Sequence, residues 1–132
     1  MRVIALAERK LRKGIRAVPE KEREVQDAFE TLLIGADIPH SREGESIEYS
    51  SKKYIPDFTI DRADLAIDLK LCAAATHEKS IIAEINDDIL AYGTKYGNLL
   101  FVVYDCGFIR DTDKFSGVFE SSGAVYVRVV KH

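Results

Sequence analysis

Two aspartates and a lysine occur close together in YIPDFTIDRADLAIDLK, residues 54–70, where most of the neighbouring residues are apolar. A charged side chain in an apolar strand is costly unless another group pairs with it. Because side chains alternate along a strand, Asp68 and Lys70 share one face. If the strand before the TIDRAD turn pairs with the strand after it as a hairpin, Asp57 comes to lie beside Asp68.

Two converging carboxylates with a lysine could bind a metal ion. Their hard oxygen atoms suit Mg²⁺ or Mn²⁺. The same spacing is also consistent with an ion-paired cluster at a sheet edge that has only a structural role, because structural ion pairs are common. These three residues alone leave both interpretations open.

A helix expected at residues 20–34 offers a further acid to the same patch. On a helical wheel Glu22 lies about 60° from Val25, at the flank of the apolar stripe, and Gln26 follows one turn later. A helix that covers the sheet would direct Glu22 and Gln26 toward the polar patch and leave Glu24 elsewhere. Alternatively, Glu22 is only a favourable charge at the positive end of the helix dipole.

The apolar pattern around these residues predicts an α/β fold in which helices flank a mixed sheet of four or five strands. The continuous apolar run at 99–104 is typical of a strand covered on both faces in a parallel sheet. The expected elements are an amphipathic helix broken near Gly14, a second helix ending at Gly35, two short strands within 47–60, a strand at 63–72, a helix from Thr76 to about Tyr92, the strand at 99–104, a short irregular or helical stretch, and a last strand at 124–130.

Composition narrows the class of protein. The chain has 132 residues, 46% hydrophobic and 31% charged, which indicates a folded globular domain and excludes a disordered chain. No apolar run reaches the roughly 20 residues that span a bilayer. The two cysteines and three histidines share no zinc-ligand spacing. We expect a cytoplasmic protein with reduced cysteines and no membrane contact.

The N-terminus is basic although the whole chain has a net charge of −3. Residues 1–16 contain six Lys and Arg against one acid, Glu8, which is consistent with contact to nucleic acid, an anionic membrane surface or a partner subunit. We expect residues 1–18 to form a basic amphipathic helix beside a main domain at 19–132. Its apolar stripe must be covered by its own domain, by a second subunit or by a part of the chain absent here. We expect this helix to help form a homodimer, with its basic face left free to meet phosphate.

The order of these motifs resembles the PD-(D/E)XK nuclease superfamily. PDF at 56–58 is followed by DLK at 68–70 on the next strand, and Glu22 stands on the preceding helix where those enzymes often carry an additional acid. The later AEINDDILAYGTKYGNLLFVVYD is similar to the helix and strand that follow in a restriction-endonuclease-like core. The resemblance covers about residues 20–105 and implies a restriction-endonuclease-like sandwich with a mixed central sheet.

The resemblance also implies roles for particular residues. Asp57 and Asp68 would bind Mg²⁺ or Mn²⁺ together with the backbone carbonyl of Leu69, and Glu22 would reach a metal-bound water or a second ion. Lys70 would orient the nucleophile and offset negative charge, and whether it also acts as a base stays open. Gln26 is a possible further member of the site.

The function implied is a metal-dependent endonuclease, on DNA in preference to RNA, of the restriction or phage-defence type or a branched-DNA resolvase. A catalytically silent nuclease-like module that binds nucleic acid or assembles a complex is the alternative, and an interaction domain with an ion-paired sheet edge is the third hypothesis. A core this small has little surface for reading bases, so a protein partner or further domain is expected.

Other polar residues are weaker candidates. Asp87 and Asp88 lie on successive faces of the third helix, so at most one can face inward, and a solvent-facing position is expected. Asp105 is expected to serve a turn. Tyr92 and Tyr96 are expected to pack in the core and at the helix end.

Overall fold

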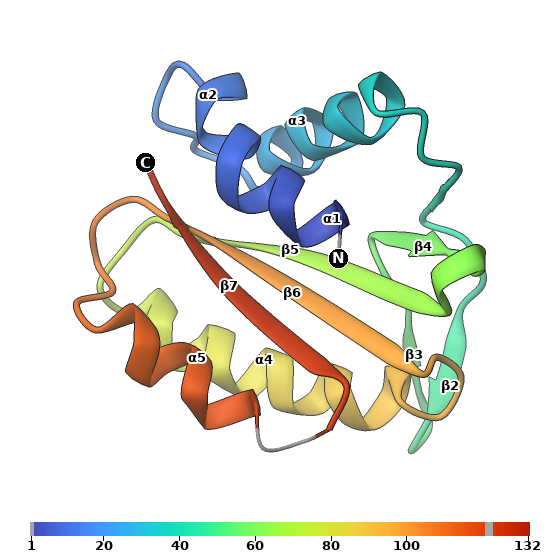
Figure 1. Ribbon diagram of the computed structural model, residues 1–132. Helices are drawn as coiled ribbons and strands as arrows, with labels where there is room; N and C mark the ends of the chain where they lie inside the picture. Colours follow the sequence, from blue (N-terminus) through green and yellow to red (C-terminus); the bar gives the residue numbers. More distant parts are fainter. Residues whose placement is uncertain (1, 121–122) are drawn as a thin grey trace.

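A five-stranded sheet separates two layers of helices (Figure 1). The computed structural model describes residues 2–120 and 123–132. The order of strands across the sheet is β1-β4-β5-β6-β7. These strands are β1 (Ser41–Arg42), β4 (Phe58–Ile60), β5 (Leu65–Cys72), β6 (Asn98–Asp105) and β7 (Val125–Lys131). β1, β4 and β5 pair antiparallel, whereas β5, β6 and β7 pair parallel, so the predicted mixed α/β sandwich is confirmed.

The two faces of the sheet carry different helices (Figure 1). One face is covered by α1 (Arg2–Leu6), the π-helical turn η1 (Ala7–Leu11), α2 (Arg12–Gly14) and α3 (Glu22–Gly35). The other is covered by α4 (His77–Tyr92) and α5 (Thr112–Glu120). Leu65, Ile67 and Leu69 belong to the core beneath α3, and Ala66 and Cys72 to the core beneath α4. β5 therefore alternates as predicted.

β6 is the strand with the most uniform apolar sequence, and every residue from Leu99 to Asp105 is buried. Leu100 and Val102 face one core, while Phe101 and Val103 face the other. Because both faces of β6 are covered, none of its central side chains faces solvent, and its sequence is therefore a continuous apolar run.

The apolar stripe of the N-terminal helix is covered by its own chain. Ile4, Ala7, Leu11 and Ile15 are at most 9% exposed and pack in the same core as Phe29 of α3. The stripe is thus not a surface for a second subunit, contrary to the packing that we expected, because α3 and β7 already lie against it. Dimerisation itself stays a prediction.

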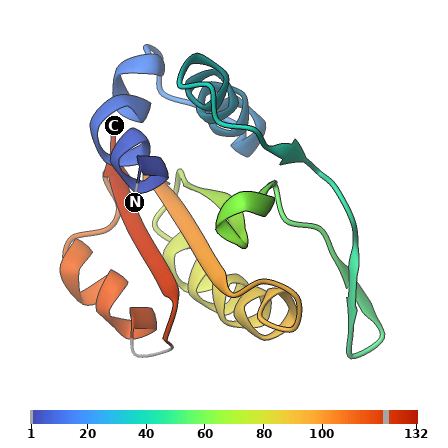
Figure 2. The ribbon, with the colours of Figure 1, turned by 45° about the vertical axis from the view of Figure 1, so that its right-hand side comes forward.

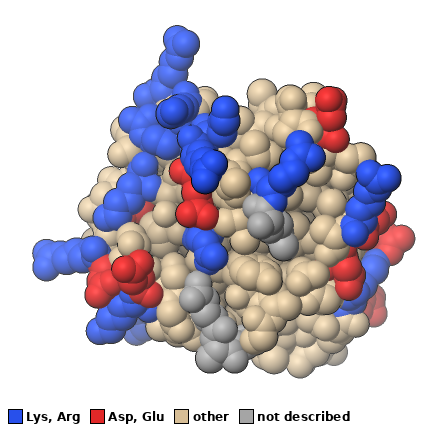
Figure 3. All heavy atoms as spheres, viewed as in Figure 1, with Lys and Arg blue, Asp and Glu red and all other residues tan. Residues whose placement is uncertain are grey.

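The basic face of this helix remains open to solvent. Figure 3 shows Lys and Arg side chains gathered over the N-terminal helices. The exposed basic residues of this face, called the basic N-terminal face below, are Arg9, Lys10, Arg12, Lys13 and Arg16. In the described part of the chain, no helix is both long and apolar enough to pass through a bilayer.

The segment before the site contains more strands than predicted. β1 lies in the region expected to be a loop, and β2 (Ile47–Tyr49) and β3 (Lys52–Tyr54) form a separate hairpin that extends beyond the sheet (Figure 2). Ser50 and Ser51 at its turn have positive φ angles of 52° and 64°, which match the twist of a two-residue hairpin turn. The sequence carries no glycine there, so it predicts two short strands with a bend and not this tight turn.

Candidate active site

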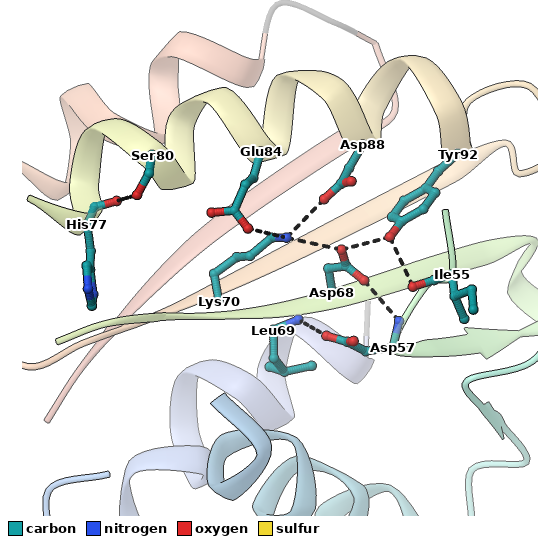
Figure 4. A network of polar contacts seen from close by, with 10 residues as sticks. All are labelled: Ile55, Asp57, Asp68, Leu69, Lys70, His77, Ser80, Glu84, Asp88 and Tyr92. Atoms are coloured by element: carbon teal, nitrogen blue, oxygen red, sulfur yellow. Dashed lines mark hydrogen bonds and ion pairs between the residues drawn. The ribbon is translucent and has the colours of Figure 1, made fainter. Parts of the chain in front are cut away.

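The site forms where β4 stops along the edge of β5. β4 pairs only with the first three residues of β5, from Leu65 to Ile67. Beyond them a side chain takes the place of a neighbouring strand, because Asp57 Oδ2 accepts the backbone N–H of Leu69 at 2.8 Å. The backbone N–H of Asp57 in turn donates to Asp68 Oδ1 at 2.9 Å. The two aspartates that the sequence singled out are therefore locked side by side (Figure 4).

Glu22 occupies the next position along this edge. Its carboxylate lies close enough to the backbone N–H of Leu71 for that dipole to favour the charged form, and it interacts electrostatically with Lys70 and Asp57. The N–H and C=O of one strand residue point to the same edge, so the carbonyl of Leu69 also faces this side. A short stretch of β5 is therefore bordered by four oxygen-bearing groups, which are the carboxylates of Asp57, Asp68 and Glu22 and the backbone carbonyl of Leu69.

Gln26 lies on the same flank of α3 as Glu22, in agreement with the helical wheel. Its side chain lies near Asp57, where the amide favours the charged form of that carboxylate. Gln26 Oε1 also lies 3.4 Å from a guanidinium nitrogen of Arg42 in β1. Glu24 is exposed instead, and its Oε2 accepts the backbone N–H groups of residues 20 and 21 as a cap of the helix.

Lys70 faces α4 on the opposite side of the sheet from Glu22's helix (Figure 4). Its Nζ is 3.0 Å from Asp88 Oδ2, 3.4 Å from Asp68 Oδ2 and 3.6 Å from Glu84 Oε1. Only 7% of Lys70 is exposed, so these three carboxylates compensate a charge that water does not reach. The hydroxyl of Tyr92 donates to Asp68 Oδ2 at 2.9 Å.

Burial and charge shift the pKa values of the site. Burial raises the pKa of Glu22 to about 7, although Lys70 opposes the rise. Burial, reinforced by the Asp57 carboxylate, raises the pKa of Asp68 well above its ordinary value, and burial likewise raises that of Asp57. Burial opposes the charge of Lys70, but the carboxylates of Asp68 and Asp88 outweigh it, so the pKa of Lys70 is raised.

The acids outnumber the bases here, since Lys70 pairs with Asp68, Glu84 and Asp88 and also interacts electrostatically with Glu22 and Asp57. An excess of buried negative charge favours the binding of a cation. Among the residues that the structure describes, no three His, Cys, Asp or Glu side chains close around one point as a complete metal site. Mg²⁺ in proteins is commonly held by one or two carboxylates and completed by water and substrate phosphate. Asp57 and Asp68, with the Leu69 carbonyl, fit a site of that open kind.

α4 contributes more to the site than the sequence predicted. The expectation that Asp88 faces solvent is wrong, because Asp88 is 8% exposed and pairs with Lys70, whereas Asp87 is exposed. The signal was present in the spacing, since Ile81, Ile85 and Asp88 recur on one face and the same face continues at Tyr92. Its polarity alone predicts a surface position for Asp88, because the sequence does not show that Lys70 is its buried partner.

Of the remaining candidates, Asp105 stands apart from the cluster, whereas Tyr92 contacts it. Asp105 is fully buried, and its carboxylate accepts the backbone N–H groups of Phe108 and Ile109, as expected of a turn. Tyr92 packs in the core as expected, but its contact with Asp68 was not foreseen.

Comparison with known proteins adds independent evidence. The family model described as REase_DpnII-MboI, which represents DpnII-MboI restriction endonucleases, matches residues 5–131. The match includes both helical layers and all residues of the cluster around β5. Searches of curated proteins and of solved structures gave no match.

Proposed function

We propose that this chain, which belongs to the DpnII-MboI restriction endonuclease family, is a metal-dependent endonuclease that hydrolyses DNA phosphodiester bonds at the edge of β5. Membership of the family indicates a DNA endonuclease of the restriction type. The proposal adds the metal ion and the residues. The observation that carries it is the reciprocal pair of hydrogen bonds by which Asp57 and Asp68 are joined, with Lys70 beside them.

Asp57, Asp68 and the carbonyl of Leu69 would hold the metal ion, for which Mg²⁺ or Mn²⁺ is the best match to oxygen ligands. When bound, such an ion neutralises charge that develops on the scissile phosphate and makes a water molecule more acidic. The raised pKa values of both aspartates mean that their charges are poorly compensated by the protein alone. This is the state in which a carboxylate pair has most to gain from a divalent cation.

Lys70 supplies a fixed positive charge beside the two aspartates. Its raised pKa keeps the ammonium protonated at neutral pH, so a role in orienting the nucleophile and stabilising negative charge is favoured over a role as general base. Glu22 is better suited to accept a proton, because a carboxylate with a pKa of about 7 exchanges protons efficiently near neutral pH.

Plasmid nicking by the purified chain tests the proposal. Supercoiled DNA is incubated with Mg²⁺, with Mn²⁺ and with EDTA, and the wild type is compared with Asp68→Ala and with Asp87→Ala. Asp87 is a matched control because it is an exposed aspartate one residue from the network. We expect nicking that needs the metal and is lost only in Asp68→Ala. Equal nicking by Asp68→Ala and wild type would refute the assignment of the site.

The same preparation separates the enzyme from a silent module. DNA binding without nicking under any metal would favour a nuclease-like binding protein. A parallel comparison of linear duplex with branched DNA distinguishes restriction-type cleavage from resolvase activity, and the family favours the linear duplex.

A further inference from the structure

Two polar side chains of α4, one turn apart, point toward the residues of β5 that carry the proposed chemistry (Figure 4). Asp88 contacts Lys70, and Tyr92 contacts Asp68. Both are buried, with exposures of 8% and 3%. Neither belongs to the motif formed by Asp57, Asp68 and Lys70, and each contacts a different member of that motif.

The hydroxyl of Tyr92 lies in a rigid position. Its ring stacks on Phe101 with an angle of 7° between the planes and meets the edge of Tyr54. The hydroxyl lies 2.9 Å from Asp68 Oδ2 and 3.3 Å from the carbonyl oxygen of Ile55. Ile55 is two residues before Asp57, so one phenol contacts Asp68 directly and the segment that leads into Asp57.

The ammonium of Lys70 pairs with both Asp88 and Asp68 but lies closer to Asp88. The distance from Lys70 Nζ to Asp88 is 3.0 Å, shorter than the 3.4 Å to Asp68 and the 3.6 Å to Glu84. Glu84 is half exposed and therefore a weaker anchor. Without Asp88, the nearest buried carboxylate left to Lys70 is Asp68, and a closer pair with Lys70 would compete with a metal ion for its Oδ2.

We propose that Asp88 and Tyr92 are positioning residues of the nuclease site, Tyr92 fixing the carboxylate of Asp68 and Asp88 fixing the ammonium of Lys70. This inference rests on the proposed function. Removing a group that hydrogen-bonds to a metal ligand and orients it typically lowers metal affinity or activity by about 10- to 100-fold. The two residues contact different partners, so their removal should have different effects.

Two substitutions with matched controls separate these effects. Tyr92→Phe removes only the hydroxyl, and Tyr96→Phe is its control because Tyr96 is a half-buried tyrosine of the segment after α4. Asp88→Asn removes the charge, Asp88→Glu restores it, and Asp87→Asn is the exposed control. The measurements are Mn²⁺ affinity by electron paramagnetic resonance, single-turnover nicking at saturating Mn²⁺, and thermal melting without metal.

We expect Tyr92→Phe to weaken Mn²⁺ binding by about 10-fold or more, because it frees a proposed ligand. Asp88→Asn should lower the single-turnover rate at saturating Mn²⁺ by about 10-fold or more, because it misplaces Lys70, and Asp88→Glu should recover part of that rate. Melting reports whether each variant is folded, and a variant that fails to fold would count against a positioning role for that residue.

If Tyr92→Phe and Asp88→Asn match their controls in both Mn²⁺ affinity and rate, while the wild type nicks DNA, the positioning roles are refuted and the proposed function stands. A wild type that neither binds Mn²⁺ nor nicks DNA refutes both.

Discussion

Replacing Glu22 with Gln should change how the stability of the metal-free protein depends on pH. Glu22 has an ordinary pKa of 4.5, and burial raises its pKa to about 7 in the folded protein. As pH rises through this window, the unfolded chain releases the proton before the folded chain does. The free energy of unfolding therefore decreases with pH between about 4.5 and 7. Glutamine has no proton to release, so this contribution disappears in the variant.

The size of the effect follows from the shift. One pKa unit corresponds to about 1.4 kcal/mol, so a rise from 4.5 to about 7 corresponds to about 3.5 kcal/mol, which solvent screening reduces because Glu22 is only partly buried. Asp57 and Asp68 also have raised pKa values, and their contributions decrease with pH in the same direction. They are present in both proteins and largely cancel in the comparison. The stability of Glu22→Gln relative to wild type should thus increase by about 2–3 kcal/mol from pH 4.5 to pH 8.

Urea denaturation in the presence of EDTA measures this difference. Wild type, Glu22→Gln and Glu24→Gln are unfolded at pH 4.5 and pH 8, and Glu24→Gln is the control because Glu24 is an exposed cap of the same helical turn. If the free energies of unfolding of wild type and Glu22→Gln differ by the same amount at pH 4.5 and at pH 8, the reasoning is refuted. Such a result would show that Glu22 has the same pKa in the folded and unfolded states.

Three further predictions concern the site and the surface. Asp68→Asn keeps an acceptor for the N–H of Asp57, and its amide nitrogen donates to the hydroxyl of Tyr92, which can donate to the carbonyl of Ile55 instead. Because the substitution removes a poorly compensated charge, urea unfolding without metal at pH 8 should show a gain of about 1 kcal/mol or more while nicking is lost; a loss of stability would contradict this. Lys70→Ala should lose most nicking activity and retain Mn²⁺ affinity in isothermal titration, because lysine is not a ligand, and a parallel loss of both would mean that its role is misread. Replacing Lys10 and Lys13 of the basic N-terminal face with Gln should reduce the log–log salt slope of DNA binding by about 0.9 for each phosphate contact removed, measured by filter binding, and an unchanged slope would exclude this face from the contact.

Much of the fold could be predicted because its signals are local. The alternation from Leu65 to Leu71 predicts which side chains of β5 face each layer of helices, and the apolar run of β6 predicts burial on both faces. The structure agrees with both predictions. Glu22 and Gln26 were found for the same reason, since a helical wheel needs only the residues of one helix. The hairpin turn at Ser50 and Ser51 was missed because these residues adopt positive φ without the glycine that usually marks it.

The contribution of α4 could not be predicted in the same way. Whether an aspartate is buried depends on whether a cation from another element meets it, and Lys70 is 18 residues away from Asp88. Tyr92 was correctly placed in the core, but the partner of its hydroxyl is Asp68 on a different strand. Non-local pairing of this kind leaves no periodic trace in the sequence.

The short length of β4 explains why acidic side chains gather at this edge. A strand interior needs partners for its backbone N–H groups, and beyond Ile67 no strand in the part of the chain that the structure describes supplies them on the side of β4. The carboxylate of Asp57 accepts the N–H of Leu69 instead, and the carboxylate of Glu22 lies near the N–H of Leu71. A longer β4 would satisfy both groups with uncharged carbonyls and would remove the cluster. The end of β4 therefore gives the carboxylates a structural role as partners of backbone N–H groups and leaves the Leu69 carbonyl beside them. The edge of β5 that no described strand pairs with is thus the one at which we propose that DNA is cut.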